Sequence, residues 1–320
     1  MRKHLQSFDQ ALEAYLRSRR ALGRAYRGEE RVIGKLRNFL QATHRSDLDR
    51  SGFDAWRAGL GHCVHNTQVD YAVAILKFCR YRRQRDLDCF LPERSSIARH
   101  RPYPLPSPVG EAEVLRLLGF IDHYQLTTDP KLRRAALRLA IVLLHTTGLR
   151  RGELVRLTLG DLDLDAGVLR IEASKFHKSR WVPLSASATK ELHVYLEARV
   201  KLVRSSAASS RLLYNCASRA YSANGISSAV SRIMRHSGIW PADKVPRVHD
   251  LRHGFAVSAL KRWYQEGRDV QSELPKLAMY MGHVSIASTA HYLRYMPAVV
   301  ELASNRFGNA FGDIVKGGAS

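Results

Sequence analysis

Cysteines and long apolar runs are scarce in this chain of 320 residues. Its four cysteines form no C-x-x-C pair and no regular framework, which excludes a disulfide scaffold and fits a reducing cytosol. The longest apolar stretch, residues 135–144, is interrupted by an arginine and is too short to cross a bilayer. The basic start is followed by no apolar segment, so no signal peptide is expected. Together these absences predict a soluble, cytoplasmic protein.

Metal-binding and nucleotide-binding patterns are also missing. His62, Cys63 and His65 lie close together, but no second cluster of ligands completes a tetrahedral zinc site. There is no glycine-rich phosphate-binding loop, and helices do not alternate with strands as in a Rossmann-like sheet. The sequence therefore predicts a protein that needs neither a metal nor a nucleotide cofactor.

Acidic residues are far fewer than basic ones. The chain has 51 Lys and Arg against 29 Asp and Glu, which gives a formal net charge of +22. The excess is spread along the chain rather than confined to a tail, so both halves are expected to face a polyanion. Nucleic acid is the favoured partner; association with the ribosome or with an anionic membrane surface is the alternative.

Apolar periodicity predicts a mainly α protein with two domains and a small antiparallel β-sheet. Residues 1–94 show four amphipathic helices, the first of which follows a capping-box pair at Ser7 and Gln10. Residues 95–108 contain four prolines and no helical period, which indicates an extended, stiff linker. Residues 109–296 form the second domain, and residues 297–320 carry an apolar stripe at four-residue intervals.

The second domain is expected to combine helices with one hairpin. A helix should begin at Asp129-Pro130 and stop at Gly148, because proline suits the first helical position and glycine the end. Apolar strands at 168–171 and 181–184 flank a polar turn at 174–179. Further helices are predicted to start near Ala186, Ile226, Asp250, Ser272 and Ile286.

Six polar side chains follow one another in an order that suits attack on a phosphodiester: Arg150, Lys175, His249, Arg252, His283 and Tyr292. Such cleavage requires a nucleophile, cations that neutralise the non-bridging oxygens, and an acid that protonates the leaving oxygen. A phenol suits the first task, guanidiniums suit the second, and an ammonium at the tip of a turn suits the third.

Several of these assignments have rivals nearby. Lys178 shares the turn of Lys175, and Tyr295 lies one helical turn beyond Tyr292. Either His249 or His283 could contact the phosphate or assist proton transfer, because imidazole titrates near neutrality. Two further residues receive other roles: Arg151 is expected to contact the phosphate backbone, and His253 to be structural.

These residues stand in four motifs that together resemble the tyrosine recombinase (phage integrase) family. The motifs are T-G-L-R at 147–150, the hairpin at 174–184, H-D-L-R at 249–252, and M-G-H at 281–283 with a tyrosine nine positions later. Tyr292 fits the family's interval from His283, and Lys175 matches the family's catalytic lysine. Gly152 replaces a common serine and Met281 a common leucine, without removing a group that the chemistry needs.

The resemblance implies a C-shaped DNA clamp, built from a helical core-binding (SAM-like) domain and an α+β catalytic domain. Tyr292 would attack DNA to give a 3′-phosphotyrosine and a free 5′-hydroxyl, and Glu153 would orient a neighbouring basic group. The tail, residues 297–320, would dock into a neighbouring subunit or pack on its own domain. Contacts to DNA are expected from Arg80, Arg82, Arg83, Arg85, Arg151 and Lys178.

The resemblance also implies a tetramer on two DNA duplexes, formed by this chain alone or with a related recombinase. The short stretch before Ser7 leaves no room for an arm-binding domain, which favours a transposon, integrative-element or chromosome-resolution enzyme. Integration or excision of a mobile element is the favoured task. The alternatives are Xer-like dimer resolution, type IB topoisomerase-like relaxation, and a catalytically silent DNA-binding regulator.

Overall fold

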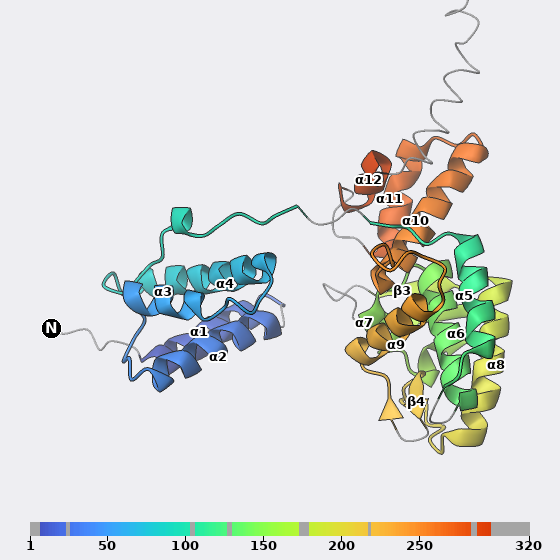
Figure 1. Ribbon diagram of the computed structural model, residues 1–320, viewed down its shortest axis with the longest axis horizontal. Coiled ribbons are helices and arrows are strands. Elements are labelled where there is room, and N and C mark those ends of the chain that lie inside the picture. Colours follow the sequence, from blue (N-terminus) through green and yellow to red (C-terminus); the bar gives the residue numbers. More distant parts are fainter. Residues whose placement is uncertain are drawn as a thin grey trace, which may run out of the picture. The chain divides into compact units, whose positions relative to one another are not determined.

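The chain divides into two compact units, residues 1–104 and 105–320 (Figure 1). The computed structural model describes residues 7–23, 26–102, 106–126, 130–172, 179–216, 219–282 and 287–295. Helices dominate both units, and small antiparallel sheets occur in the second. This confirms the mainly helical fold class expected from the sequence.

The described part of the first unit contains four α-helices and one short 3₁₀ helix. They are α1 (Phe8–Arg20), α2 (Arg27–Ala42), α3 (Arg50–Ala58), α4 (His65–Arg83) and η1 (Arg94–Ser96). Ser7 caps α1 as predicted: its hydroxyl accepts from the Gln10 amide, and the Gln10 side chain accepts from the Ser7 amide, both at 3.2 Å. The core includes Tyr15 and Phe78, whose rings meet edge to face at 5.4 Å between centroids.

Part of the proline-rich segment packs on this first unit. Ile97 is buried in its core. Asn66 at the start of α4 exchanges hydrogen bonds with the backbone of Arg101, and the His65 imidazole lies 2.9 Å from the Arg99 carbonyl oxygen. Side chains of α4 therefore hold the backbone at residues 99 and 101 against the first unit, while the extended linker over residues 95–108 stays a prediction.

The second unit contains eight α-helices among its described residues, together with one short 3₁₀ helix and five short strands. They are α5 (Glu111–His123), α6 (Pro130–Thr146), α7 (Arg151–Leu154), η2 (Leu159–Asp161), β1 (Leu162–Asp163), β2 (Val168–Ile171), β3 (Arg180–Pro183), α8 (Ala186–Leu202), β4 (Tyr214–Cys216), β5 (Arg219–Ala220), α9 (Ala223–His236), α10 (Val248–Gln265), α11 (Val270–Met281) and α12 (Ala287–Tyr295).

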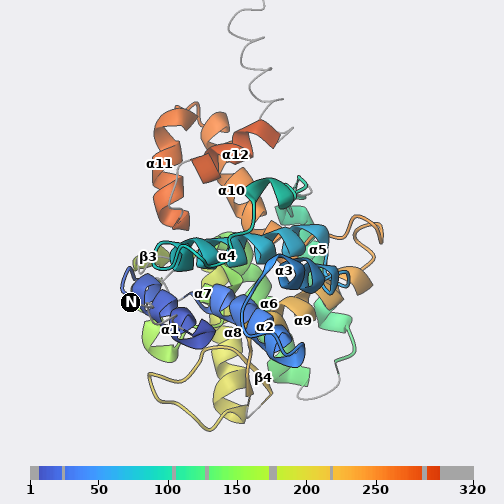
Figure 2. The same ribbon diagram turned by 90° about the vertical axis from the view of Figure 1, so that its left-hand side faces the viewer.

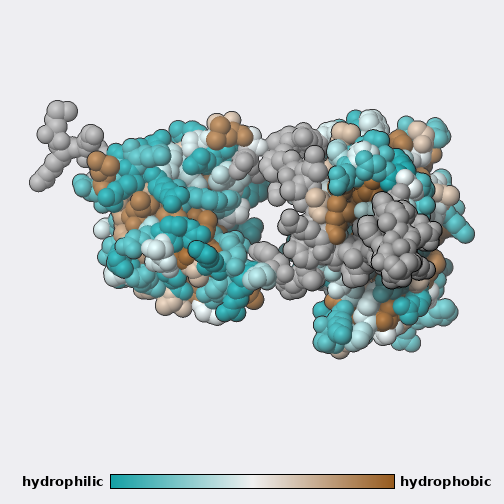
Figure 3. Space-filling view, turned by 90° about the horizontal axis from the view of Figure 1, so that it is seen from above, coloured by the Kyte–Doolittle hydropathy of each residue, from teal (hydrophilic) through white to brown (hydrophobic). Residues whose placement is uncertain are grey.

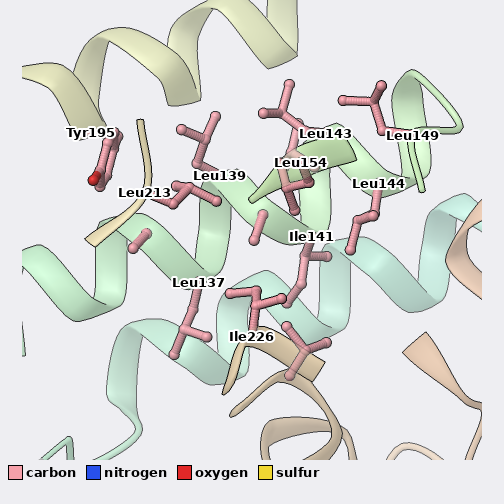
Figure 4. Close-up of a cluster of buried hydrophobic side chains, with 14 of the residues drawn as sticks. Leu137, Leu139, Ile141, Leu143, Leu144, Leu149, Leu154, Tyr195, Leu213 and Ile226 are labelled. Carbon is pink, nitrogen blue, oxygen red and sulfur yellow. The ribbon is translucent and has the colours of Figure 1, made fainter. Parts of the chain in front are cut away.

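Helix α6 is the centre of the second unit. It is apolar on almost every side, which is typical of a helix surrounded by others. Figure 4 shows Leu139, Ile141 and Leu143 of this helix in one buried cluster with Leu154 and Ile226, contributed by α7 and α9. The packing fixes the end of α6, and with it the turn that leads to Arg150.

The predicted hairpin is present with one additional strand. β2 pairs with β3 in antiparallel register, so that Leu169 lies opposite Val182, and β1 adds to the other edge of β2. The sequence did not indicate α5, β1 or the second sheet of β4 and β5. Strands of two or three residues are too short to show a clear alternation of apolar and polar positions.

Helices α10, α11 and α12 lie side by side (Figure 2), and a smaller apolar cluster fills the space between them. Leu260 of α10, Leu277 and Met281 of α11, and Tyr292 of α12 all belong to it. The surface shown in Figure 3 is mainly hydrophilic, as expected when the apolar side chains fill interior clusters. Within the described ranges, none of the helices combines the length and the apolar composition that a bilayer-spanning segment needs.

Candidate active site

One buried carboxylate joins two arginines from different elements. Arg150 precedes α7, and its backbone amide and guanidinium donate to Glu153 at 3.0 and 2.8 Å. Arg180, at the start of β3, donates at 2.9 Å to Oε2, the carboxylate oxygen that also accepts the Arg150 amide. Glu153 thus holds the Arg150 side chain and ties it to the hairpin; its orienting role in catalysis stays a prediction.

The Glu153 carboxylate keeps its charge in spite of its burial. Burial by itself would raise its pKa, but the hydrogen bonds and charge of Arg180, together with those from Arg150, bring the pKa down to about 2. The group is therefore ionised across the physiological pH range. A permanent negative charge here offsets part of the positive charge that gathers at this site.

Arg150 and Arg252 both bind the end of α11. Arg150 Nη2 donates to the Gly282 carbonyl oxygen at 2.6 Å, and Arg252 Nη2 donates to that of Met281 at 2.7 Å. Gly282 closes α11 in a left-handed conformation with φ of 65°, which glycine adopts at little cost. The two guanidiniums therefore meet at one helix terminus, although they lie about a hundred residues apart in the sequence.

Arg252 is also tied to the turn that precedes Arg150. Its Nη1 donates to the carbonyl oxygen of Gly148, and the residue is 1% exposed. Burial, followed by the neighbouring charge of Arg150, lowers the pKa of Arg252 to about 10, so the guanidinium still carries its proton at neutral pH. Two fixed cations at one site can neutralise a phosphate that binds there.

The Tyr292 hydroxyl meets an imidazole that the sequence did not single out for catalysis. It lies 3.0 Å from Nδ1 of His253, the residue directly after Arg252. Tyr292 is 3% exposed; burial raises its pKa, while the charges of Arg252 and Arg150 act in the opposite direction. The phenol is thus within the electrostatic field of both arginines, in an environment that keeps its proton on.

His253 is positioned by two neighbours on its own helix. Its Nε2 lies 3.8 Å from Asp250 Oδ1, and its ring meets that of His249 edge to face, with centroids 4.7 Å apart. Burial and then the positive charge of Arg252 lower the pKa of His249, which favours a neutral imidazole. Spacings of three and four residues place these side chains on one face of α10.

The structure brings four of the six expected catalytic residues into one region: Arg150, His249, Arg252 and Tyr292. Lys175 and its rival Lys178 fall in 173–178, and His283 falls in 283–286; both segments lie outside the described residues. The side chain of Tyr295 is likewise not described. Arg180 was not expected at the site, because no local pattern links it to a carboxylate 27 positions earlier.

The expected DNA contacts divide into exposed and internal groups. Arg80, Arg83 and Arg85 are exposed near the end of α4. Arg82 is 5% exposed, and its guanidinium binds both carboxylate oxygens of Asp47 at 2.7 and 2.5 Å. The expectation for Arg82 is therefore corrected: a buried guanidinium paired in this way stabilises the helical unit and is not presented to a phosphate.

Arg151 lies on the exposed side of α7, where Nη1 donates to the Ser227 hydroxyl at 3.2 Å. It is close in sequence to Arg150, yet it does not share the Glu153 carboxylate with Arg150 and Arg180. This position leaves Arg151 available at the surface, as expected for a contact to the phosphate backbone.

Paired guanidiniums, neighbouring imidazoles and a phenol are the groups of a centre for phosphoryl transfer through tyrosine. Residues 109–298 match the model of the phage integrase family. The chain therefore belongs to the phage integrase family, and it is a site-specific tyrosine recombinase.

Two relatives and two solved structures show how far this likeness extends. The integrase/recombinase y4rB of Sinorhizobium fredii is 32% identical over 310 residues, which cover 94% of this chain and 97% of that protein. The tyrosine recombinase XerC of Pelotomaculum thermopropionicum is 35% identical over 153 residues, covering 47% of this chain and 46% of XerC.

The solved structures extend the similarity to the fold. The Tn1549 transposon integrase in complex with transposon right end DNA superposes with a TM-score of 0.65 and 17% identity, over 95% of this chain and 99% of that one. The XerH recombinase bound to a palindromic difH substrate gives a TM-score of 0.63 with 21% identity, over 93% of this chain and 84% of the XerH chain. Both cover the two units of this chain.

Proposed function

We propose that the protein cleaves and rejoins duplex DNA at specific sites through a phosphotyrosine formed on Tyr292. The observation that supports this most directly is the placement of the Tyr292 hydroxyl beside His253, within the field of Arg150 and Arg252. A scissile phosphate bound by the two guanidiniums would lose much of its negative charge. Its phosphorus could then be attacked by the phenolic oxygen.

The proposed step gives a 3′-phosphotyrosine and a free 5′-hydroxyl. Lys175, the first lysine of the hairpin turn, is assigned the protonation of the leaving 5′-oxygen, with His249 and His283 assisting at the phosphate. A 5′-hydroxyl from a partner duplex then attacks the ester and releases Tyr292. Because the bond energy is kept in the ester, the reaction needs neither ATP nor a metal.

DNA as the partner is supported by charge and by relatives. The net charge of +22 attracts a polyanion, and the Tn1549 integrase and XerH structures contain DNA. We assign Arg80, Arg83, Arg85, Arg151 and Lys178 to phosphate contacts and the two units to a clamp around the duplex. The assembly is a tetramer on two duplexes, to which residues 297–320 contribute by docking between subunits.

Mobility of a genetic element is the favoured biological task. Support comes from the near full-length similarity to an integrase/recombinase and from the fold shared with a transposon integrase. Resolution of chromosome or plasmid dimers is the second candidate, supported by the 35% identity to XerC over about half of the chain. Sequencing the DNA joined in a covalent complex recovered from cells distinguishes the two.

The test is a nicked suicide duplex that carries a recombination site selected from a DNA library by binding. The wild type should form a covalent protein–DNA adduct, whereas Tyr292→Phe should bind with unchanged affinity and form none. Tyr280→Phe serves as the matched control, since Tyr280 is a neighbouring tyrosine that stacks on Phe255. Loss of Arg150 or Arg252 should slow adduct formation by about a hundredfold or more.

The outcomes separate the rival activities. No adduct with the wild type on the selected site would support a silent DNA-binding regulator. Relaxation of a supercoiled plasmid that lacks any selected site would support a topoisomerase-like activity instead. An adduct that persists in Tyr292→Phe would disprove Tyr292 as the nucleophile.

A further inference from the structure

The Tyr292 phenol sits where bulk water cannot readily take its proton. The residue is 3% exposed, and burial raises its pKa. A phenol must give up its proton when its oxygen attacks phosphorus. In a dry site the acceptor has to be a protein group within hydrogen-bond distance, and among the described residues Nδ1 of His253 lies there, at 3.0 Å.

The surroundings of His253 favour the tautomer that can accept this proton. Its second nitrogen, Nε2, faces Asp250 Oδ1 at 3.8 Å. Asp250 is itself held in place, because the Arg247 backbone amide donates to its Oδ2 at 2.8 Å. A carboxylate on the Nε2 side favours a proton on that nitrogen, which leaves a lone pair on Nδ1 toward the phenol. Tyr292, His253 and Asp250 are then connected as nucleophile, base and orienting carboxylate.

His249 is less well placed for this task. Its ring lies against the His253 ring, with centroids 4.7 Å apart, whereas the hydrogen bond to the phenol is made by His253. His249 precedes Arg252 by three residues on α10 and feels its charge. That position suits a contact to the phosphate, which leaves proton acceptance from Tyr292 to the other imidazole.

We propose that His253 is a catalytic residue whose Nδ1 takes the phenolic proton of Tyr292 during strand cleavage. This rests on the proposed function, which names Tyr292 as the nucleophile. The O–H bond breaks, the proton moves to Nδ1, and the oxygen electron pair forms the bond to phosphorus. The bond to the 5′-oxygen breaks, and that oxygen is protonated by a separate acid, assigned above to Lys175. In rejoining, His253 returns its proton to the departing phenolate.

The direct test is His253→Asn, which places an amide near the position of Nδ1. Asparagine can keep a hydrogen bond to Tyr292 but cannot take a proton, so adduct formation on the nicked duplex should slow by about a hundredfold or more. DNA affinity and the thermal midpoint should stay close to those of the wild type. His236→Asn is the control, because His236 is an exposed histidine at the end of α9.

A fluorinated tyrosine at position 292 separates base catalysis from a structural effect. Its phenol is a stronger acid, so it needs a base less. In the His253→Asn background, the fluorinated tyrosine should raise the rate of adduct formation at least tenfold. A substrate with a 5′-bridging phosphorothiolate, which relieves the need for an acid, should raise the rate of His253→Asn little. The reverse pattern would assign His253 to the leaving group and overturn the proposal.

A measurement on the unaltered protein guards against a variant that fails to fold. Nitrogen NMR of the histidines at pH 8 should show His253 neutral, with the proton on Nε2; a proton on Nδ1 would overturn the proposal. Equal rates of adduct formation by the wild type and His253→Asn would rule out His253 as the base and leave the proposed function standing. If the wild type forms no adduct, both proposals fail.

Discussion

The Arg150 guanidinium donates a 2.6 Å hydrogen bond to the carbonyl oxygen of Gly282, a residue 132 positions later in the chain. Arg252 makes the equivalent contact one residue earlier, at Met281. The two cations are therefore fixed to the last turn of α11, which precedes the helix that carries Tyr292. The distance between cations and nucleophile is thus controlled by helix packing and not by a single loop.

Arg180→Ala should disturb catalysis although Arg180 is not among the expected catalytic residues. Its removal leaves the buried Glu153 carboxylate with one partner fewer, which costs about 1–3 kcal/mol of stability and loosens Arg150. Adduct formation should fall at least tenfold, as measured on the nicked duplex at saturating protein. Arg170→Ala on the neighbouring strand is the control, since its side chain is 45% exposed. Equal rates for the two variants would contradict this role.

Glu153→Gln should flatten part of the pH dependence of stability. The pKa of Glu153 is lowered from 4.5 to about 2, chiefly because the contacts of Arg180 and Arg150 outweigh its burial. The stabilisation is fully present above pH 4.5 and is lost as the pH falls toward 2. It amounts to about 3 kcal/mol. Urea unfolding of wild type and variant at pH 7 and pH 3 measures it. If the free energy of unfolding falls equally in the wild type and the variant between pH 7 and pH 3, the pKa of Glu153 is not low.

Gly148→Ala should cost more stability than Gly167→Ala, although both glycines have positive φ, 60° and 63°. A Cβ at Gly148 would come within 2.6 Å of the Phe255 ring, whereas one at Gly167 meets nothing within 4 Å. The shared backbone cost is about 1–2 kcal/mol, and the clash adds about 1–3 kcal/mol. Urea unfolding gives both values. The Gly148 carbonyl oxygen accepts a hydrogen bond from Arg252, so adduct formation should fall in Gly148→Ala and not in Gly167→Ala.

Arg80→Ala and Arg82→Ala should separate binding from folding in the first unit. Arg80 is exposed, so its loss should weaken DNA binding for all sequences and reduce the salt slope by about one. Arg82 is buried against Asp47, so its loss should lower the thermal midpoint instead. Fluorescence titrations at several salt concentrations and thermal unfolding measure the two effects. A lower midpoint for Arg80→Ala, with unchanged binding, would reverse the assignment.

The longer helices could be predicted from the sequence because their signals are local. The cap at Ser7 and the proline at 130 mark helix starts that the structure reproduces, and the helix expected near Ala186 begins there. Other starts differ by one to three residues, as at Ala223 for the expected Ile226. Helix α5 was missed although Gly110 and Glu113 form a capping pair at its start.

The sequence by itself determined which residue types are available for the chemistry. The order and spacing of Arg150, His249, Arg252 and Tyr292 identify the family, because phosphoryl transfer without a metal requires such cations and a nucleophile. Only the tertiary structure decided their partners. Arg180 reaches Glu153, and His253 reaches Tyr292, across elements that are distant in the chain. Hydrogen bonds depend on distances and directions between packed helices, and no pattern along one segment encodes these.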